Sequence, residues 1–373
     1  MRGGIPIGRL FGVSLRLHYS WFLIFALVTW ALAGSYFPAT QPTWSSGARI
    51  AAGVLTSLLF FGSVLAHELA HSIVAMRQGV RVLSITLFIF GGVSQIEGEP
   101  EKASDEFRMA LAGPMSSLLI GIVFWAIWRL SSGANDFVTA ISFWLGWINV
   151  SLAVFNLIPG FPLDGGRVLR SILWWRSKNV RSATRIASNI GRGAGYLFIF
   201  GGIWLVFSGY WLNGIWFALI GWFLESAAVG SYGQLLQEDM LKGHVASEVM
   251  SIDCMEVPHD STVERLVNEN ILTSGRRCFV VTSGRGVEGL IGIHNVKEVP
   301  RNLWTTKLVR DAMTPVDRVK SVKPNEDLST VLKTLVQNDI NQVPVMLNNK
   351  VVGMVTRENI INFMTAQSEL GKS

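Results

Sequence analysis

Long apolar segments without charged residues limit the folds open to this chain of 373 residues more than any other feature of its sequence. Residues 50–66 contain no charged side chain, and the longer run 193–224 contains none either. A single helix over 193–224 would extend for about 48 Å, whereas the hydrocarbon core of a bilayer is about 30 Å thick. We therefore divide this run at Ser208–Gly209 and expect two spans, of which the first is short.

The same pattern predicts a polytopic α-helical membrane protein with about six transmembrane helices. Half of the residues are hydrophobic and only 16% are charged, which is too apolar a composition for one soluble globule. The segments expected to cross the membrane are 19–37, 50–76, 109–128, 137–163, 193–208 and 209–224.

Basic residues gather on one side of these spans. Arginines are frequent before the first span and after the fourth, whereas the loops 131–136 and 209–210 contain no Lys or Arg. Because positive charge is retained on the cytoplasmic side, we expect a multi-pass protein of the cell membrane with a cytoplasmic N-terminus and C-terminal region, and with the end of the second span on the same side. The net charge of +6 then reflects contact with a lipid bilayer, and we expect no nucleic-acid partner.

Residues 82–96 differ from the spans around them. Polar and apolar residues alternate at the start of this segment, β-branched and aromatic residues dominate it, and Gly91–Gly92 offers a turn. The pattern predicts a β-hairpin rather than a helix. Because the segment is so apolar and lies next to membrane spans, we expect the hairpin to be membrane-associated and packed on protein.

From about Gly243 the composition becomes that of a soluble α/β domain, and it repeats. The segment ending at Met250 resembles the one ending at Met313, an offset of 63 residues, and the segment around Gly292 resembles the one around Gly353, an offset of 61. A period of about 60 residues predicts two stacked copies of one unit. Each copy would contain a lead helix, a second helix, two strands and a closing helix.

The sequence His67-Glu68-Leu69-Ala70-His71 follows the charge-free part of the second span. On a helix the two histidines lie one turn apart on one face, so both imidazoles can bind one metal ion, and Glu68 can reach a water molecule on that metal. Ionisable groups at such a position are costly and are by default functional candidates. The alternative is a buried histidine pair whose ring nitrogens are satisfied by backbone carbonyls.

A second polar motif, residues 156–167, closes the fourth span. Pro159 and Pro162 interrupt the helix, and Gly165–Gly166 allow a tight turn. Asp164 is thereby presented from a loop at membrane depth, where a carboxylate needs a cation. A Zn²⁺ ion bound by two imidazoles and one carboxylate keeps its fourth position open for water, as catalytic sites do.

The motifs HELAH at 67–71 and NLIPGFPLDGG at 156–166 together resemble those of the site-2 protease family of intramembrane zinc metalloproteases, in the subgroup with a C-terminal pair of CBS domains. The resemblance covers nearly the whole chain. It implies a transmembrane metalloprotease domain over 1–232, followed by a soluble α/β CBS-domain pair with repeats over 243–305 and 306–373. The implied activity is zinc-dependent hydrolysis of peptide bonds in or near transmembrane segments of membrane proteins, that is, regulated intramembrane proteolysis.

The resemblance also implies roles for individual residues. His67, His71 and Asp164 would be the zinc ligands, and Glu68 would be the general base and acid. Asn156 corresponds to the family's motif asparagine, which is proposed to contact substrate or the oxyanion. The alternative for Asn156 is a polar residue that ends a helix.

The predicted hairpin resembles the membrane-embedded β-hairpin of the family. An unwound substrate segment can pair with an open strand edge, and we expect Ile85, Phe88, Gly91 and Gly92 to bind it. The alternative is that this region only packs the fold. For Gly113–Pro114, which resembles the small-residue start of the family's next span, we favour close helix packing.

CBS pairs often bind adenosyl nucleotides, and their ribose-binding pattern is a Gly, then Thr or Ser three positions on, then Asp three positions further. The second copy has Thr356 and Asn359 at the last two positions, and the first has Asn295 and Glu298, so both lack the Asp. We expect ATP or another adenine nucleotide as a regulatory ligand there, and a homodimer or higher oligomer formed through the pair. The alternative is a purely structural dimerisation module.

Two other classes of function compete with the protease. A CBS-regulated transporter or channel would use the His/Glu/Asp cluster as an ion site, but it predicts several carboxylates within the spans. This chain has almost none beyond Glu68, Asp164 and Glu225. The third class is a catalytically silent scaffold, and the two intact motifs argue against it.

Overall fold

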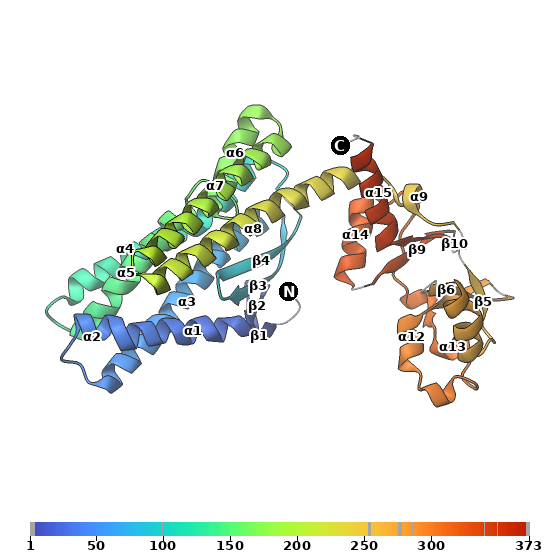
Figure 1. Cartoon of the computed structure of the whole chain (residues 1–373), viewed down its shortest axis with the longest axis horizontal. Helices are drawn as coiled ribbons and strands as arrows, with labels where there is room; N and C mark the ends of the chain where they lie inside the picture. The colour runs from blue at the N-terminus through green and yellow to red at the C-terminus, as the bar shows by residue number, and fades with distance from the viewer. Residues whose placement is uncertain are drawn as a thin grey trace. The chain divides into compact units, whose positions relative to one another are not determined.

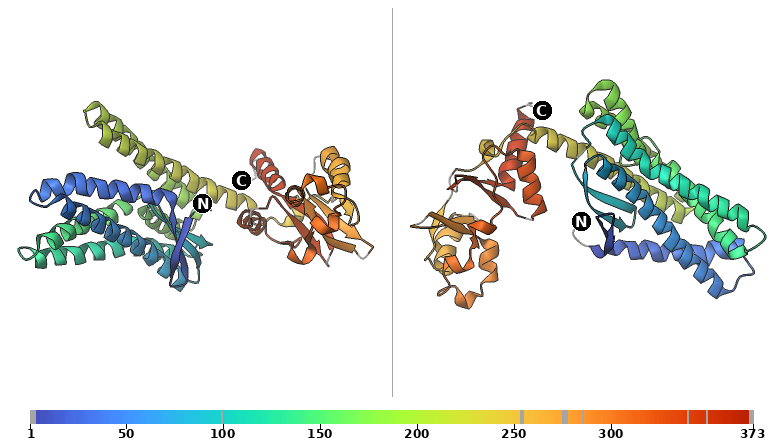
Figure 2. Two further views of the ribbon diagram at one scale, coloured as in Figure 1. Left: turned by 90° about the horizontal axis from the view of Figure 1, so that it is seen from below. Right: turned by 180° about the vertical axis from the view of Figure 1, so that it is seen from behind.

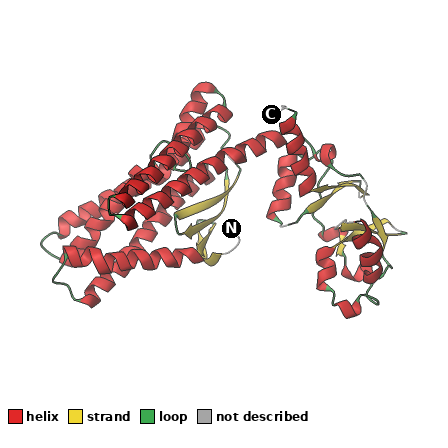
Figure 3. Ribbon diagram, in the orientation of Figure 1, coloured by secondary structure: helices red, strands yellow, loops and turns green. Residues whose placement is uncertain are grey.

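The computed structural model describes residues 4–98, 100–252, 255–274, 278–284, 286–338, 340–348 and 350–370. Contacts divide the chain into two compact units, residues 1–233 and 234–373. The first unit is mostly helical with one small sheet, and the second alternates helices with strands (Figures 1 and 3). Each unit contains hydrophobic clusters of its own.

Within the described residues, six helical segments are long and apolar enough to cross a membrane, which confirms the predicted fold class. The first combines α1 (Tyr19–Ala31), a π-helical turn η1 (Leu32–Tyr36) and α2 (Phe37–Thr40). The others are α3 (Ser46–Arg77), α4 (Ala103–Ser131), α5 (Asp136–Asn156), α7 (Val180–Phe207) and α8 (Trp211–Leu241). A shorter helix, α6 (Asp164–Ser177), stands between α5 and α7 in the sequence.

The fifth membrane-length helix ends where the sequence predicts, but it is not short. α7 begins at Val180 instead of Gly193, with Asn179 as its N-cap. A helix can continue past its apolar segment because long arginine side chains near its end can keep their charge in water. Gly209 has φ of +92°, a left-handed conformation that glycine adopts without strain, and this lets the chain turn from α7 into α8.

A four-stranded sheet packs against α3 within the first unit. Its strands are β1 (Gly4–Leu10), β2 (Val13–His18), β3 (Arg81–Phe88) and β4 (Gly91–Glu97), in the order β1-β2-β3-β4. β3 and β4 form the predicted hairpin, and it lies beside α3 in the views of Figures 1 and 2. The buried residues that join sheet and helix are Val13, Leu15, Leu69 and Ile85.

The N-terminal strands β1 and β2 are absent from the predicted fold. β2 pairs in parallel with β3, from Ser14 opposite Ser84 to Leu17 opposite Leu87. Polar and apolar residues do alternate in β2, but the segment is short and stands directly before an apolar span, so its partner strand decides its conformation. As a consequence β3 is an interior strand, paired with β2 on one side and β4 on the other.

The second unit contains the two predicted copies of an α/β unit. In the first copy, the helical turns α10 (Val263–Arg265), η2 (Leu266–Ile271) and α11 (Leu272–Ser274) precede β6 (Cys278–Ser283) and β7 (Gly286–Gly292), and α12 (Ile293–Glu298) follows. In the second copy, α14 (Leu328–Gln337) precedes β9 (Gln342–Leu347) and β10 (Lys350–Thr356), and α15 (Arg357–Glu369) follows. Short strands β5 (Glu256–Pro258) and β8 (Thr314–Pro315) complete the first sheet in the order β5-β6-β7-β8.

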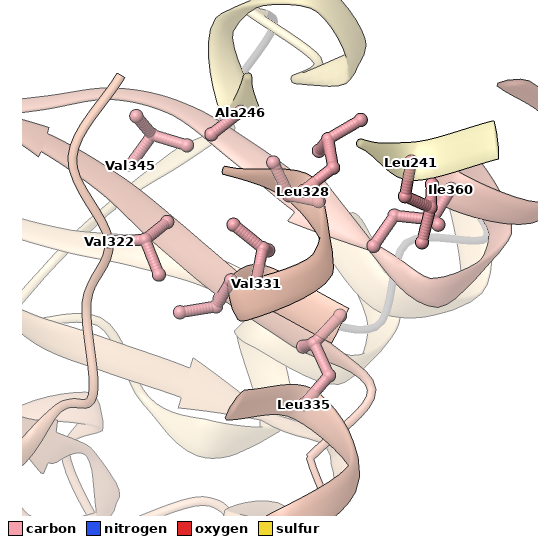
Figure 4. Packing of buried hydrophobic residues seen from close by; sticks show 10 residues of the cluster. Leu241, Ala246, Val322, Leu328, Val331, Leu335, Val345 and Ile360 are labelled. Atoms are coloured by element: carbon pink, nitrogen blue, oxygen red, sulfur yellow. The ribbon is translucent and has the colours of Figure 1, made fainter. Parts of the chain in front are cut away.

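Each copy is completed by the lead helix that precedes the other one. α9 (Ala246–Val249) contributes Ala246 to a buried cluster with Leu328, Val345 and Ile360 of the second copy (Figure 4). α13 (Val309–Ala312) contributes Val309 to the buried cluster of the first copy. The ranges 243–305 and 306–373 therefore exchange their lead helices, and the core of each range depends on the other.

Candidate metal centre

Two imidazoles and one carboxylate meet beside α3. His67 and His71 lie one turn apart on this helix, and both side chains are buried. Asp164, the first residue of α6, places its Oδ2 atom 3.1 Å from Nε2 of each histidine, and the two Nε2 atoms are 3.2 Å apart. The structure thus brings together the three residues that the sequence predicts as metal ligands.

A loop packed against glycine carries Asp164 to this position. The loop spans residues 157–163, between α5 and α6. A Cβ atom on Gly165 would lie 2.3 Å from the carbonyl oxygens of Leu157 and Ile158. Glycine is needed here because the loop folds back closely on the first turn of α6, and this contact holds the carboxylate against the imidazoles.

The remaining ring nitrogens are held by α4. Nδ1 of His71 donates to the backbone carbonyl of Met109 at 2.7 Å, and Nδ1 of His67 lies 2.9 Å from the hydroxyl oxygen of Ser117. Because a carbonyl only accepts, Nδ1 of His71 carries a proton, and in the neutral ring Nε2 is left as the ligand atom. Partners of this kind fix the ring orientation of metal-binding histidines.

Gly113 of α4 keeps the space in front of the two imidazoles open. A Cβ atom at this position would lie 2.1 Å from Nε2 of His71 and 2.6 Å from Nε2 of His67. The sequence favours close helix packing for this glycine, and the packing partner turns out to be the pair of ring nitrogens. Met109, Gly113 and Ser117 recur every four residues along α4 and so share the face that contacts the two imidazoles.

The donor set fits a zinc ion. Protein nitrogen and oxygen ligands bind Zn²⁺ at about 2.0–2.1 Å, so two ligand atoms of a tetrahedral ion are about 3.3 Å apart. The three ligand atoms here are separated by 3.1, 3.1 and 3.2 Å. The alternative is a histidine pair whose ring nitrogens are satisfied by backbone carbonyls. Only Nδ1 of His71 has such a partner here, whereas both Nε2 atoms face a carboxylate oxygen of Asp164.

Strand β4 contacts the side chain of Glu68. The hydroxyl of Ser94 donates to Oε2 of Glu68 at 2.9 Å. A Cβ atom on Gly92 would lie 2.4 Å from Cγ of Glu68, so the strand passes directly over this side chain. Glu68 as a whole is half-buried. Sequence reasoning did not single out Ser94, because only the packing of the sheet on α3 brings it to Glu68.

The predicted substrate strand is only partly accessible for pairing. Ile85 is fully buried on β3, and its strand is already paired with β2 and with β4. This corrects the expectation of an open edge at Ile85. Among the described strands, the outer edge beside the metal centre belongs to β4, where Gly91 pairs with Phe88 and Gly92 with Leu87 on the inner side.

Asn156 is the last residue of α5. Its side-chain amide donates to the backbone carbonyl of Leu152 at 3.0 Å, one turn earlier in the same helix. This is the contact expected of a residue that ends a helix. Its place is nevertheless at the start of the loop that leads to Asp164.

The four predicted nucleotide residues lie where the second strand of each copy is followed by the closing helix: Thr356 ends β10, Asn359 lies on α15, and Asn295 and Glu298 lie on α12. Asn295 accepts from the backbone N–H of Gly292 at 3.0 Å and donates to the hydroxyl of Thr314 at 3.1 Å. Thr356 and Asn359 cap each other at the start of α15, with the Thr356 hydroxyl accepting from the Asn359 N–H at 3.0 Å. The side chain of Glu298 is exposed.

Two family models match the chain. The model described as "Peptidase family M50" matches residues 55–135 and 129–202, which include all three metal ligands. The model described as "CBS domain" matches residues 309–366, in the second copy of the C-terminal unit.

Named relatives are similar along nearly the whole chain. A candidate zinc metalloprotease of Synechocystis sp., sll0528, is 34% identical over 366 residues that cover 97% of this chain and 95% of the relative. Rip3, a candidate zinc metalloprotease of Mycobacterium tuberculosis, is 31% identical over 364 residues that cover 96% of this chain and 92% of the relative. Among solved structures, the site-2 protease from Methanocaldococcus jannaschii is similar at 28% identity and a TM-score of 0.43, covering 61% of this chain and 95% of that structure.

Proposed function

Because this chain belongs to peptidase family M50, the family of site-2 proteases, we propose that it is an intramembrane zinc metalloendopeptidase that hydrolyses peptide bonds in or near transmembrane segments of other membrane proteins. One observation carries the proposal. Oδ2 of Asp164 lies 3.1 Å from Nε2 of both His67 and His71, in a unit whose helices are apolar enough to cross a membrane.

The three converging side chains would hold the metal of this reaction. His67 and His71 offer Nε2 atoms whose rings are already oriented through Ser117 and Met109, and Asp164 supplies the negative charge. When bound, zinc makes a coordinated water acidic and polarises the scissile carbonyl. Gly113 leaves the room that such a site needs.

Glu68 would transfer the proton of the reaction. Its carboxylate takes a proton from the attacking water while the water oxygen bonds to the carbonyl carbon. The same proton then passes to the nitrogen of the leaving amine as the C–N bond breaks. The hydrogen bond from Ser94 to Oε2 restricts the rotation of the carboxylate and favours one orientation for both steps.

A transmembrane substrate has to unwind before it is cut, because a helix keeps its carbonyls in its own hydrogen bonds. Addition of the unwound segment to the outer edge of β4 is the route that the sheet order supports. Gly91 and Gly92 carry no side chain that would hinder a second backbone, and Gly92 contacts Glu68. Ile85 and Phe88 would act indirectly, by building the strand on which β4 rests.

Asn156 would donate a hydrogen bond to a carbonyl oxygen of the substrate. To do so, its amide must leave the carbonyl of Leu152, with which it forms a hydrogen bond of ordinary length at the last residue of α5. Asn156→Ala should then lower kcat without changing zinc content, and Asn156→Gln should restore part of the rate. Equal kcat in Asn156→Ala and the unchanged chain would assign this residue to helix termination alone.

The C-terminal unit would regulate the membrane unit. We expect an adenine nucleotide such as ATP at Asn295, Glu298, Thr356 and Asn359, and a homodimer or higher oligomer formed through the paired repeats. Basic residues on one side of the spans support a cell-membrane location in which the N-terminus, the active-site side and this unit are cytoplasmic.

The pairing of two acids on the membrane-length helices does not favour the transporter alternative. Glu106 forms an ion pair with Arg170, and Glu225 lies 3.5 Å from Arg192. A carboxylate paired with an arginine is a poor ligand for a passing cation, because the guanidinium compensates its negative charge and repels a second positive charge. Of the three acids that the sequence offers for this alternative, Glu68 and Asp164 then remain, and both belong to the proposed protease site.

The test is zinc-dependent cleavage of a single-span membrane protein by the full chain in lipid vesicles. We expect cleavage to stop on chelation and to return when zinc is added, and Glu68→Gln to remain inactive throughout. Cation flux through the same vesicles, measured without substrate, tests the transporter reading. Zinc-loaded chain that leaves a panel of single-span substrates intact but carries ions would overturn the proposal.

A further inference from the structure

A buried ion pair joins α4 to α6 beside the metal centre. Glu106, in the first turn of α4, is 0% exposed, and Arg170 of α6 is 6% exposed. Nε of Arg170 donates to Oε1 of Glu106 at 2.6 Å, and a terminal guanidinium nitrogen contacts the same oxygen. Removing two charges from water is costly even when they pair, so a pair at this depth calls for a specific reason.

Glu106 lies on the face of α4 that orients the histidines. The backbone carbonyl of Met109, one turn further along α4, accepts a hydrogen bond from Nδ1 of His71, and the Ser117 hydroxyl lies within hydrogen-bond distance of Nδ1 of His67. Residues spaced by three, four and four along a helix remain on one face, so Glu106 continues the row formed by Met109, Gly113 and Ser117. Glu106 of the ion pair therefore lies on the same helix as Met109 and Ser117, which orient His71 and His67.

Arg170 contacts the chain on both sides of the third ligand. It lies on α6, the helix that begins with Asp164. Its guanidinium carbon also stands 5.4 Å from the ring centroid of Phe161, in the loop that precedes Asp164. A single side chain thus ties the loop before the carboxylate and the helix after it to Glu106 on α4.

We propose that the Glu106–Arg170 pair positions Asp164 against His67 and His71 and thereby sets the affinity of the centre for zinc. His67 and His71 come from one helix and are held one turn apart by it, whereas Asp164 arrives on a separate loop. The distance between the Asp164 carboxylate and the imidazoles depends on how α6 packs against α4, and the Glu106–Arg170 ion pair is a charged contact between these two helices. The inference rests on the proposed function for the identity of the metal.

Replacing both partners by glutamine tests the pair without leaving one buried charge unpaired. Glu106→Gln with Arg170→Gln keeps a polar contact but loses the charges and the cation–π contact with Phe161. We expect zinc affinity, measured by competition with a chelator, to fall by about 10- to 100-fold, as it does when other groups that orient metal ligands are lost. The visible absorption of the Co²⁺-loaded full chain should change as well, because it reports ligand number and geometry.

The more exposed ion pair of Arg192 with Glu225 provides a control for the loss of a charged pair between two helices. It joins α7 to α8, which carry no ligand of the centre, at 3.5 Å. Arg192→Gln with Glu225→Gln should leave zinc affinity and the Co²⁺ spectrum unchanged. A purely structural role for Glu106 and Arg170 predicts a lower unfolding temperature with unchanged affinity and an unchanged spectrum, and that result overturns the inference.

A second variant covers the case in which the double substitution does not fold. Arg170→Lys keeps the charge but loses the contact of two guanidinium nitrogens with Glu106. Weaker zinc binding with an altered Co²⁺ spectrum supports the inference, and unchanged values overturn it. Because these readouts do not involve cleavage, a chain that binds zinc and cuts nothing contradicts the proposed function without contradicting this inference.

Discussion

The hydroxyl of Ser94 lies 2.9 Å from Oε2 of Glu68, so a strand of the sheet holds the carboxylate next to the metal ligands. The two residues belong to different elements, β4 and α3, and the strand edge proposed for substrate is therefore linked to the proposed proton carrier. Gly92 strengthens this link, since it leaves no space between the strand and Glu68.

Ser94→Ala should slow the reaction without removing the metal. A hydrogen bond to a charged acceptor contributes roughly 1.5–3 kcal/mol, so we expect kcat to fall by about tenfold or more while zinc content stays the same. The control is Ser84→Ala, because the Ser84 hydroxyl donates to Gln95 within the sheet. Equal kcat in both variants and the unchanged chain would show that Ser94 does not orient Glu68.

Glu68→Gln should keep zinc and stop cleavage. The amide has nearly the same shape as the carboxylate but cannot take a proton from water, and positioned general bases contribute about 10²- to 10⁴-fold. Zinc per chain and turnover of a single-span substrate should be measured on the same preparation. Turnover close to that of the unchanged chain would remove Glu68 from its assigned role.

His67→Ala should lose zinc. A catalytic zinc site has three protein ligands, and without His67 only His71 and Asp164 remain to bind the ion. His294→Ala, a change at an exposed histidine in the C-terminal unit, is the control and should retain full zinc content. Stoichiometric zinc in the His67→Ala protein would contradict the ligand set.

Gly113→Ala should abolish zinc binding while leaving the helix intact. Alanine is a better helix former than glycine by roughly 0.8–1 kcal/mol, but its Cβ atom would stand 2.1 Å from Nε2 of His71. Gly201→Ala on α7 is the control, because a Cβ atom there meets nothing within 4 Å. The idea fails if Gly113→Ala binds zinc as tightly as Gly201→Ala.

Thr356→Ala should lower the stability of the C-terminal unit and remove its response to ATP. Loss of the α15 cap costs about 1 kcal/mol of unfolding free energy, and it also removes one of the predicted nucleotide contacts. Asp327→Ala removes the cap of α14, where Asp327 accepts from the Ser329 N–H at 2.8 Å, and should cost as much stability while keeping the ATP response. Thermal unfolding of the full chain with and without ATP measures both effects. An unchanged chain that shows no shift with ATP would contradict the nucleotide proposal.

Local patterns were sufficient for the membrane helices and for the two C-terminal copies. Apolar length marks a span and a period of about 60 residues marks a repeat, and neither needs knowledge of neighbours in space. Boundaries were less certain, as α7 shows, because polar residues at a helix end continue the helix without adding to its apolar length. β2 was missed because its pairing with β3 joins segments more than sixty residues apart.

The sequence by itself determined that His67 and His71 share one helical face with Glu68 beside them, because helical spacing is a local property of the backbone. Only the tertiary structure decided that Asp164 reaches both imidazoles, that Gly113 leaves room in front of them, that Ser94 holds Glu68, and that Arg170 docks α6 on Glu106. These contacts join segments far apart in the chain. They depend on how helices, loop and sheet pack together, and no local pattern of residues records that packing.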